Sequence, residues 1–269
     1  MGHIRLGRIP KSRRWTTVVS LLASERDGGG SGGTAVLEAD VAPVATATLE
    51  AARQGLERAV DDRGLRYTFY LLTQIVLAAR EDDWQGGLRP FGIVLPGDAT
   101  LFDLTAGVHD AVDDHLAAHG RPTDVSEMAQ QAAGEALAAL AGPRVATLFG
   151  SGRDELQAAV RGLSTKQGFA DLGQRFFGRF MAHYLNFYLS RVTATHLGDG
   201  PLRQIGDITQ FDDALRAHCQ QSARVVHDYC GEWYSKTEFR EGISLDNTSR
   251  FMAVAVNKLR AELGQQVGS

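Results

Sequence analysis

The chain has 269 residues, 43% hydrophobic and 22% charged, which is the composition of a folded globular protein and excludes wholesale disorder. At this length it can bury a substantial core, in one large domain or two small ones. The formal net charge of −4 excludes a nucleic-acid-binding surface spread over the whole molecule.

Residues 1–25 form a basic arm, because no acidic residue precedes Glu25. Within it "HIRLGRIP" alternates apolar and basic residues as an extended segment does, and a short amphipathic helix follows. Residues 26–40 contain "RDGGGSGG", which is typical of a flexible tether. Arg13, Arg14 and Trp15 are therefore candidate binding residues, and this arm is the only place where we expect contact with nucleic acid. Packing of the arm back onto the body is the simpler alternative.

Residues 41–269 are predicted to form one helical body, with a sub-boundary near 142–152, because apolar residues recur at helical spacing almost throughout. Apolar stripes predict helices around 49–60 and 67–79, from Leu101 to a stop at Gly120, from a capping box of Asp124 and Glu127 to Gly142-Pro143, from Ser164 to Gly198, from about Phe211 to Tyr234, and from Leu245 to Leu263. "RPFGIVLPGD" breaks the pattern before Leu101.

The predicted helix from Ser164 to Gly198 is the longest and is apolar nearly all round from Phe176 onward, which indicates a central, buried helix. Its small residues Gly168, Gly173, Gly178 and Ala182 would let neighbouring helices approach closely. The sequence therefore predicts an all-α fold, a multi-helix bundle with long central helices and a short extended and helical N-terminal arm.

Neither an oxidising compartment nor a membrane is indicated. Cys219 and Cys230, which are predicted to share one helix, would lie about 16 Å apart, too far for a disulfide. Both side chains are predicted to be buried inside the protein, and the protein is expected in a reducing cytoplasm. No apolar run approaches the length of a membrane span, and the twin arginine in "KSRRWTT" lacks the rest of an export signal. The 24 Arg against four Lys indicate a bacterial genome of high GC content.

"LSRVTATHLGDG" places Arg191 and His196 near the end of the longest predicted helix, with four residues between them. This spacing resembles that of the HEPN-type ribonucleases, which serve as toxins or antiviral effectors. The resemblance implies that the imidazole transfers a proton while the guanidinium holds the phosphate, without a metal. In a chain with eight His and 24 Arg, however, chance alone supplies about two such pairs.

Two His/Asp clusters raise the question of a metal site. In "HDAVDDHLAAH", residues 109–119, helical spacing places Asp110 and Asp114 on one face of the helix, and His115 and His119 likewise share a face. The candidate ligands there are His109, Asp110, Asp114 and His115. The doublet His227-Asp228 has His183 or His196 upstream and Asp246 downstream, which would complete the residue list of an HD-type metal-dependent phosphohydrolase. The simpler expectations are a solvated acidic helix face and a structural histidine.

"CGEWYSKTEF" gathers Trp233, Tyr234, Lys236 and Phe239 where a helix is predicted to end. Aromatic residues with adjacent charges are typical of protein interfaces, and equally of a helix end tucked under a loop. The chain contains no P-loop, GxGxxG or GxSxG motif, and no cofactor is predicted. The expected function is a non-catalytic interaction or adaptor protein, a subunit of a bacterial multi-protein system, with the ribonuclease and the phosphohydrolase as alternatives.

Overall fold

The computed structural model describes residues 55–145, 153–194, 216–217 and 219–268, and there every regular element is a helix, which confirms the all-α prediction. The elements are α3 (Arg63–Ala78), α4 (Trp84–Leu88), η2 (Arg89–Phe91), α5 (Leu101–His119), α6 (Asp124–Val145), α7 (Arg153–Arg161), η3 (Gly162–Ser164), α8 (Lys166–Ala194), η4 (Ala223–Val226), α10 (His227–Glu241) and α11 (Leu245–Gly268). Residues 55–59 and 219–222 are also helical.

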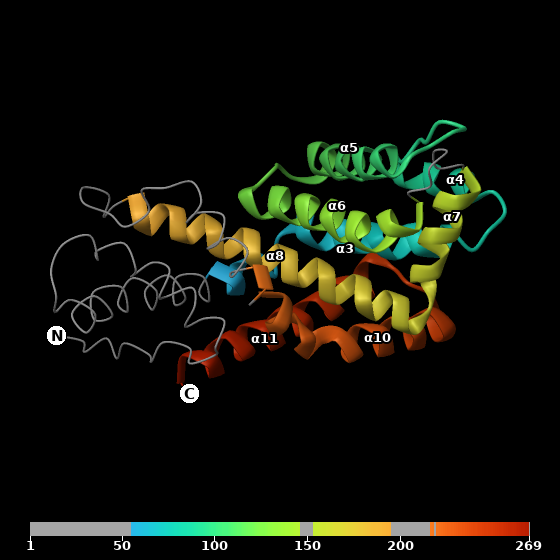
Figure 1. Ribbon diagram of the computed structural model, residues 1–269. Coiled ribbons are helices and arrows are strands. Elements are labelled where there is room, and N and C mark those ends of the chain that lie inside the picture. The colour runs from blue at the N-terminus through green and yellow to red at the C-terminus, as the bar shows by residue number, and fades with distance from the viewer. Residues whose placement is uncertain (1–54, 146–152, 195–215, 218, 269) are drawn as a thin grey trace, which may run out of the picture.

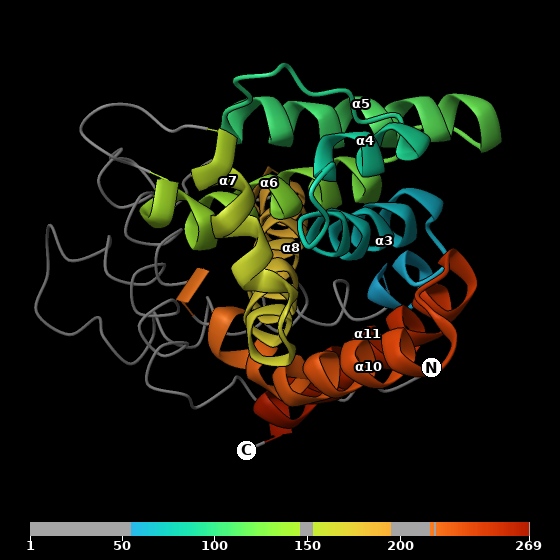
Figure 2. The ribbon, with the colours of Figure 1, turned by 90° about the vertical axis from the view of Figure 1, so that its right-hand side faces the viewer.

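The helices stack in three layers (Figures 1 and 2). Helix α5 forms one outer layer, α10 and α11 form the other, and α3, α6 and α8 lie between them. Helix α8 contacts α6 on one side and α10 on the other, as expected for a central helix. No helix in the described part of the chain combines the length and the apolar character that crossing a bilayer requires.

An aromatic cluster around Phe69 of α3 holds the middle layer to the outer layer formed by α10 and α11. The Phe69 ring is fully buried, and its centroid lies 5.3 Å from that of Phe176 and 5.4 Å from that of Phe251. Phe169, Phe177 and Trp233 are further aromatic neighbours of Phe69. These residues come from α3, α8, α10 and α11, so one cluster fixes the relative positions of four helices.

Two glycines of α8 allow the close approach that the sequence predicted. A Cβ on Gly173 would lie 2.2 Å from Sγ of Cys230, and one on Gly178 would lie 2.6 Å from Oε1 of Gln220. Any side chain at these positions would therefore push α8 away from the segments packed against it.

Two predicted helix starts are wrong by one residue. Helix α6 is capped by Thr123, whose hydroxyl accepts a hydrogen bond from the Ser126 amide at 3.0 Å while the Ser126 hydroxyl accepts one from the Thr123 amide at 2.8 Å. Helix α8 is capped by Thr165, whose Oγ1 accepts from the Gly168 amide at 3.0 Å. In both cases a threonine next to the predicted cap satisfies the free amides.

The predicted helix from Phe211 to Tyr234 is wrong in its extent. The 3-10 turn η4 interrupts it, and α10 continues beyond Tyr234 to Glu241, ending at Gly242 with φ of 75°. Helix α6 likewise runs through Pro143 to Val145. Cys219 and Cys230, on either side of η4, are free and fully buried, and burial raises the pKa of both thiols.

Candidate functional site

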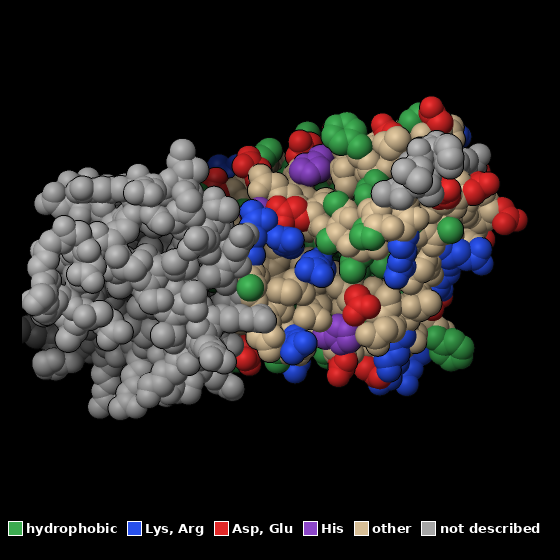
Figure 3. All heavy atoms as spheres, viewed as in Figure 1, with side chains coloured by type: hydrophobic (Ala, Val, Ile, Leu, Met, Phe, Trp, Pro, Cys, Tyr) green, Lys and Arg blue, Asp and Glu red, His purple; other side chains and the backbone are tan. Residues whose placement is uncertain are grey.

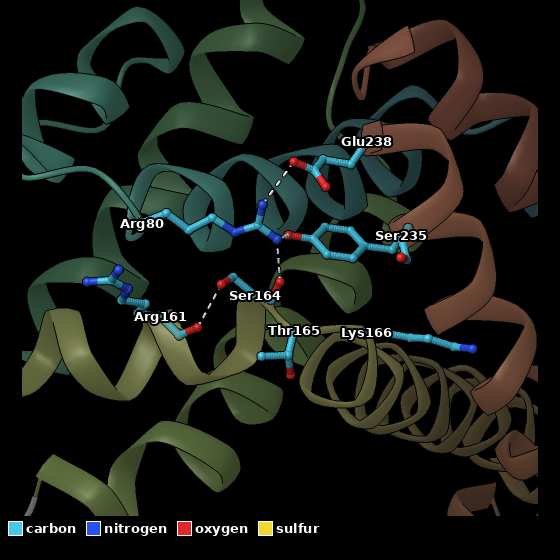
Figure 4. A pocket seen from close by; sticks show the side chains of 8 residues that line it. Arg80, Arg161, Ser164, Thr165, Lys166, Ser235 and Glu238 are labelled. Atoms are coloured by element: carbon cyan, nitrogen blue, oxygen red, sulfur yellow. Dashed lines mark hydrogen bonds and ion pairs between the residues drawn. The ribbon is translucent and has the colours of Figure 1, made fainter. Parts of the chain in front are cut away.

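An open pocket of about 380 Å³ lies where the end of α3, the turn between α7 and α8, and α10 meet (Figure 4). Its lining is polar and includes three cationic side chains and one carboxylate. The lining residues are Arg80, Arg161, Ser164, Thr165, Lys166, Tyr234, Ser235 and Glu238. The α10 wall of the pocket thus belongs to the "CGEWYSKTEF" segment that the sequence singled out.

Arg80 holds the walls of the pocket together. Its Nη1 donates to Oε1 of Glu238 at 2.9 Å, and its Nη2 donates to the Tyr234 hydroxyl at 3.0 Å and to the Ser164 carbonyl. The same guanidinium lies 5.8 Å from the centroid of the Tyr234 ring. Since both Nη atoms of Arg80 donate to protein groups, Arg80 joins three segments of the chain and is not free to bind a ligand through them.

Arg161 and Lys166 supply the charge at the mouth of the pocket. Both are exposed, and Figure 4 shows their side chains extending to opposite sides of it. Lys166 pairs with Glu232, which also accepts from Lys236 at 2.6 Å, and these two ammonium groups lower the pKa of Glu232 to about 2. The described residues give the Arg161 guanidinium no ion pair, so the pocket mouth carries an excess of positive charge.

The Ser164 and Thr165 hydroxyls of the pocket are used by the protein itself. The Ser164 hydroxyl donates to the Arg161 carbonyl at 2.7 Å, and Oγ1 of Thr165 caps α8. Burial raises the pKa of Tyr234, an effect that Arg80 opposes and Glu238 reinforces, so the phenol stays protonated. The arrangement is suited to binding an acidic group between flanking cations.

The structure divides the four residues singled out in "CGEWYSKTEF" into a pair that packs in or against the core and a pair that lies at the surface. Tyr234 is buried in the core and stacks on Phe169, whereas Trp233 is half-buried and stacks on Phe251 against the core. Lys236 and Phe239 lie at the surface, where Phe239 is 89% exposed. Phe239 follows Ser235 by four residues and Lys236 by three, so it stands on the outer face of α10 beside the pocket.

The metal candidates on α5 do not share a common centre. The His115 ring stacks on the Tyr67 ring, with centroids 3.7 Å apart, and on the His119 ring, with centroids 4.6 Å apart. Burial lowers the pKa of His115, and the positive charges of His119 and Arg63 lower it further. His109 lies against α6 near Gly134, while Asp110 and Asp114 are exposed. In the described ranges, no three His, Cys, Asp or Glu side chains converge on a position for a metal ion.

His227 lies between two carboxylates. Its Nδ1 is 2.8 Å from Oδ1 of Asp228 and its Nε2 is 3.0 Å from Oδ1 of Asp171. Of the residues that the phosphohydrolase alternative would add, His183 contacts Glu135 and Asp246 pairs with Arg250, while His196 lies outside the described residues.

Several predicted residues cannot be located in this way. Arg191 lies in the last turn of α8, and its side chain is not described; His196 lies outside the described residues, as do Arg13, Arg14 and Trp15. The ribonuclease pair and the binding role of the arm therefore stay predictions.

Sequence reasoning missed the pocket residues Arg80, Arg161 and Lys166. Arg80 and Glu238 are separated by 158 positions, and no local pattern announces such a contact. Comparisons of the chain with protein-family models, with curated proteins and with solved structures gave no match.

Proposed function

We propose that the protein is a non-catalytic interaction protein, an adaptor or subunit of a bacterial multi-protein system, which binds an acidic partner protein through the α10 surface. This surface consists of Phe239, Lys236 and the two flanking cations of the pocket, Arg161 and Lys166. The observation that carries the proposal is the 89% exposure of the Phe239 side chain beside that pocket.

Phe239 has the properties of an interface anchor. An exposed phenylalanine stabilises nothing in the free protein, but burying it in a partner contributes about 1.5–3 kcal/mol. Aromatic side chains at the centre of an interface, surrounded by polar groups, often dominate the binding energy. Phe239 fits this description because Lys236 lies one turn away and Ser235 borders the pocket.

The charges around Phe239 favour an acidic partner. Lys166 and Lys236 share the single carboxylate of Glu232, and Arg161 adds a third cation at the pocket mouth. Such an excess attracts an acidic surface during encounter and repels a basic one. A partner segment with a carboxylate for the pocket mouth and an apolar hollow for Phe239 would satisfy both features.

Affinity capture from cells of the native host tests this proposal with a matched pair of variants. Phe102 on α5 is 78% exposed and lies in the opposite outer layer, so Phe102→Ala is the control for Phe239→Ala. We expect Phe239→Ala to weaken capture of a stoichiometric acidic partner about tenfold or more while Phe102→Ala leaves capture unchanged. Equal capture by both variants would count against the α10 surface.

The basic arm is the second predicted contact. A chain that lacks residues 1–33 should capture less partner while the body keeps its unfolding transition. Unchanged capture by this shortened chain would remove Arg13, Arg14 and Trp15 from the interaction.

A further inference from the structure

A second pocket, of about 340 Å³, lies where α8 faces η4 and the helical turn at residues 219–222. It is lined almost entirely by polar side chains, among them three glutamines and two arginines. The lining residues are Leu140, Asp171, Gln174, Arg175, Gln220, Gln221 and Arg224. Figure 3 shows several Lys and Arg side chains on the face that α8 crosses, with Asp, Glu and His side chains between them.

Arg175 of α8 and Arg224 of η4 are the cations of this pocket, and within the described ranges neither guanidinium has a hydrogen bond or an ion pair. Arginines close by show the contrast. Arg179, one turn after Arg175, lies 3.2 Å from Oε2 of Glu135, and Arg216 lies 3.7 Å from the same atom. In the described part of the chain, Arg175 and Arg224 therefore differ from Arg179 and Arg216 in having no carboxylate partner.

The one carboxylate of the pocket is already engaged. Oδ1 of Asp171 lies 3.0 Å from Nε2 of His227, whose other ring nitrogen contacts Asp228. Asp171 is thus engaged by His227, and in the described part of the chain no ion pair joins it to Arg175 or Arg224. The amide of Gln174 donates to the Gln220 carbonyl at 3.2 Å, which ties the two walls together.

We propose that this pocket binds the phosphate group of a small phosphorylated molecule, with Arg175 and Arg224 as its principal contacts. Guanidinium groups bind phosphate oxygens with pairs of parallel hydrogen bonds, which a carboxamide or a hydroxyl cannot match. A phosphate monoester carries a charge of about −1.5 to −2 at pH 7, which two guanidiniums balance, whereas a single carboxylate would leave one of them unpaired.

The volume of the pocket favours a small molecule over a nucleic acid. Ligand sites commonly enclose about 300–1,000 Å³, a range that includes this pocket. A polyanion would need a track of free cations, whereas Arg179 and Arg216 are both paired with Glu135, whose single carboxylate offsets part of their charge. This inference is independent of the α10 surface, because the two share no residue.

Calorimetric titration of the full chain tests the proposal with three probes: inorganic phosphate, phenyl phosphate and a single-stranded oligonucleotide. We expect saturable binding of both phosphates at low salt, and we expect Arg175→Gln and Arg224→Gln each to weaken it about tenfold or more. Arg250→Gln is the control, because Arg250 is an exposed residue of α11 that pairs with Asp246.

Three results would overturn the proposal: no saturable phosphate binding, equal binding by all three variants, or binding of the oligonucleotide alone. If a glutamine variant fails to fold, Arg175→Lys and Arg224→Lys replace it. These keep the charge but lose the paired donors, so phosphate binding should still weaken, and unchanged affinity in them counts against the site.

Discussion

The Trp233 indole stacks on the Phe251 ring, with centroids 4.2 Å apart and planes inclined by 23°. This contact joins α10 to α11 inside the aromatic cluster around Phe69. Trp233 therefore packs against the core, whereas Phe239, six positions later on the same helix, is exposed.

We expect Trp233→Ala to lower the free energy of unfolding by about 2–4 kcal/mol, because the substitution removes a large, half-buried ring that packs on Phe251. Phe239→Ala should change it by no more than about 0.5 kcal/mol, since the ring is exposed. Urea unfolding of the two variants beside the unaltered chain measures both values. Similar losses in the two variants would contradict the division between core and surface.

His227 should make the stability depend on pH. Burial lowers its pKa, but hydrogen bonds and charge interactions with Asp228 and Asp171 outweigh burial and raise the pKa above the ordinary value of 6.5. The folded protein therefore binds this proton more tightly than the unfolded chain does. The resulting stabilisation is fully present below pH 6.5 and is lost as the pH rises through the raised folded-state pKa.

The comparison of the unaltered chain with His227→Gln, by urea unfolding at pH 5.5 and 8.5, isolates this contribution. The variant should be less stable at the lower pH, and the difference should shrink at the higher pH. A difference that grows toward high pH would mean that His227 is neutral in the folded protein.

Arg80→Ala should lower the free energy of unfolding by about 1–3 kcal/mol, because the carboxylate of Glu238, the Tyr234 hydroxyl and the Ser164 carbonyl lose their common donor. The matched control is Arg250→Ala, which removes an exposed pair on α11 and should cost no more than about 0.5 kcal/mol. Chemical unfolding distinguishes the two, and equal costs would show that Arg80 does not join the pocket walls.

The ribonuclease alternative makes a separate prediction for the end of α8. If Arg191 and His196 cut RNA, the purified chain should cleave RNA in the presence of a metal chelator, and Arg191→Ala or His196→Ala should each abolish cleavage. Arg203→Ala, which alters an arginine that is not in the motif, is the control. Cleavage that survives both motif substitutions would end this alternative.

The sequence predicted the fold class because apolar residues at helical spacing mark buried faces locally, as in α5, which begins at Leu101 and has the predicted stop Gly120 as its C-cap. Competing caps are harder to rank. Thr123 and Asp124 are both good caps, and only the pairing with Ser126 decides between them. The turn η4 lies in a segment whose apolar spacing is compatible with a continuous helix.

The pockets could not be predicted for a different reason. Arg175 and Arg224 are 49 positions apart, and Arg80 and Ser164 are 84 apart, so their proximity depends on how α8 crosses the other helices. Composition placed the aromatic residues of "CGEWYSKTEF" together but could not tell Trp233 from Phe239. That distinction depends on which face of α10 meets α11, which is a tertiary property.

Because Gly173 approaches Cys230 closely, the reactivity of the Cys230 thiol reports the separation of α8 from α10. The Cys230 thiol lies between α8 and α10 with no exposed surface, so an alkylating reagent can reach it only after these helices separate. The rate of alkylation therefore measures how often the central helix parts from its neighbour. Cys219, which is equally buried and precedes η4, reports on a second place, and unequal rates would show which of the two places opens more often.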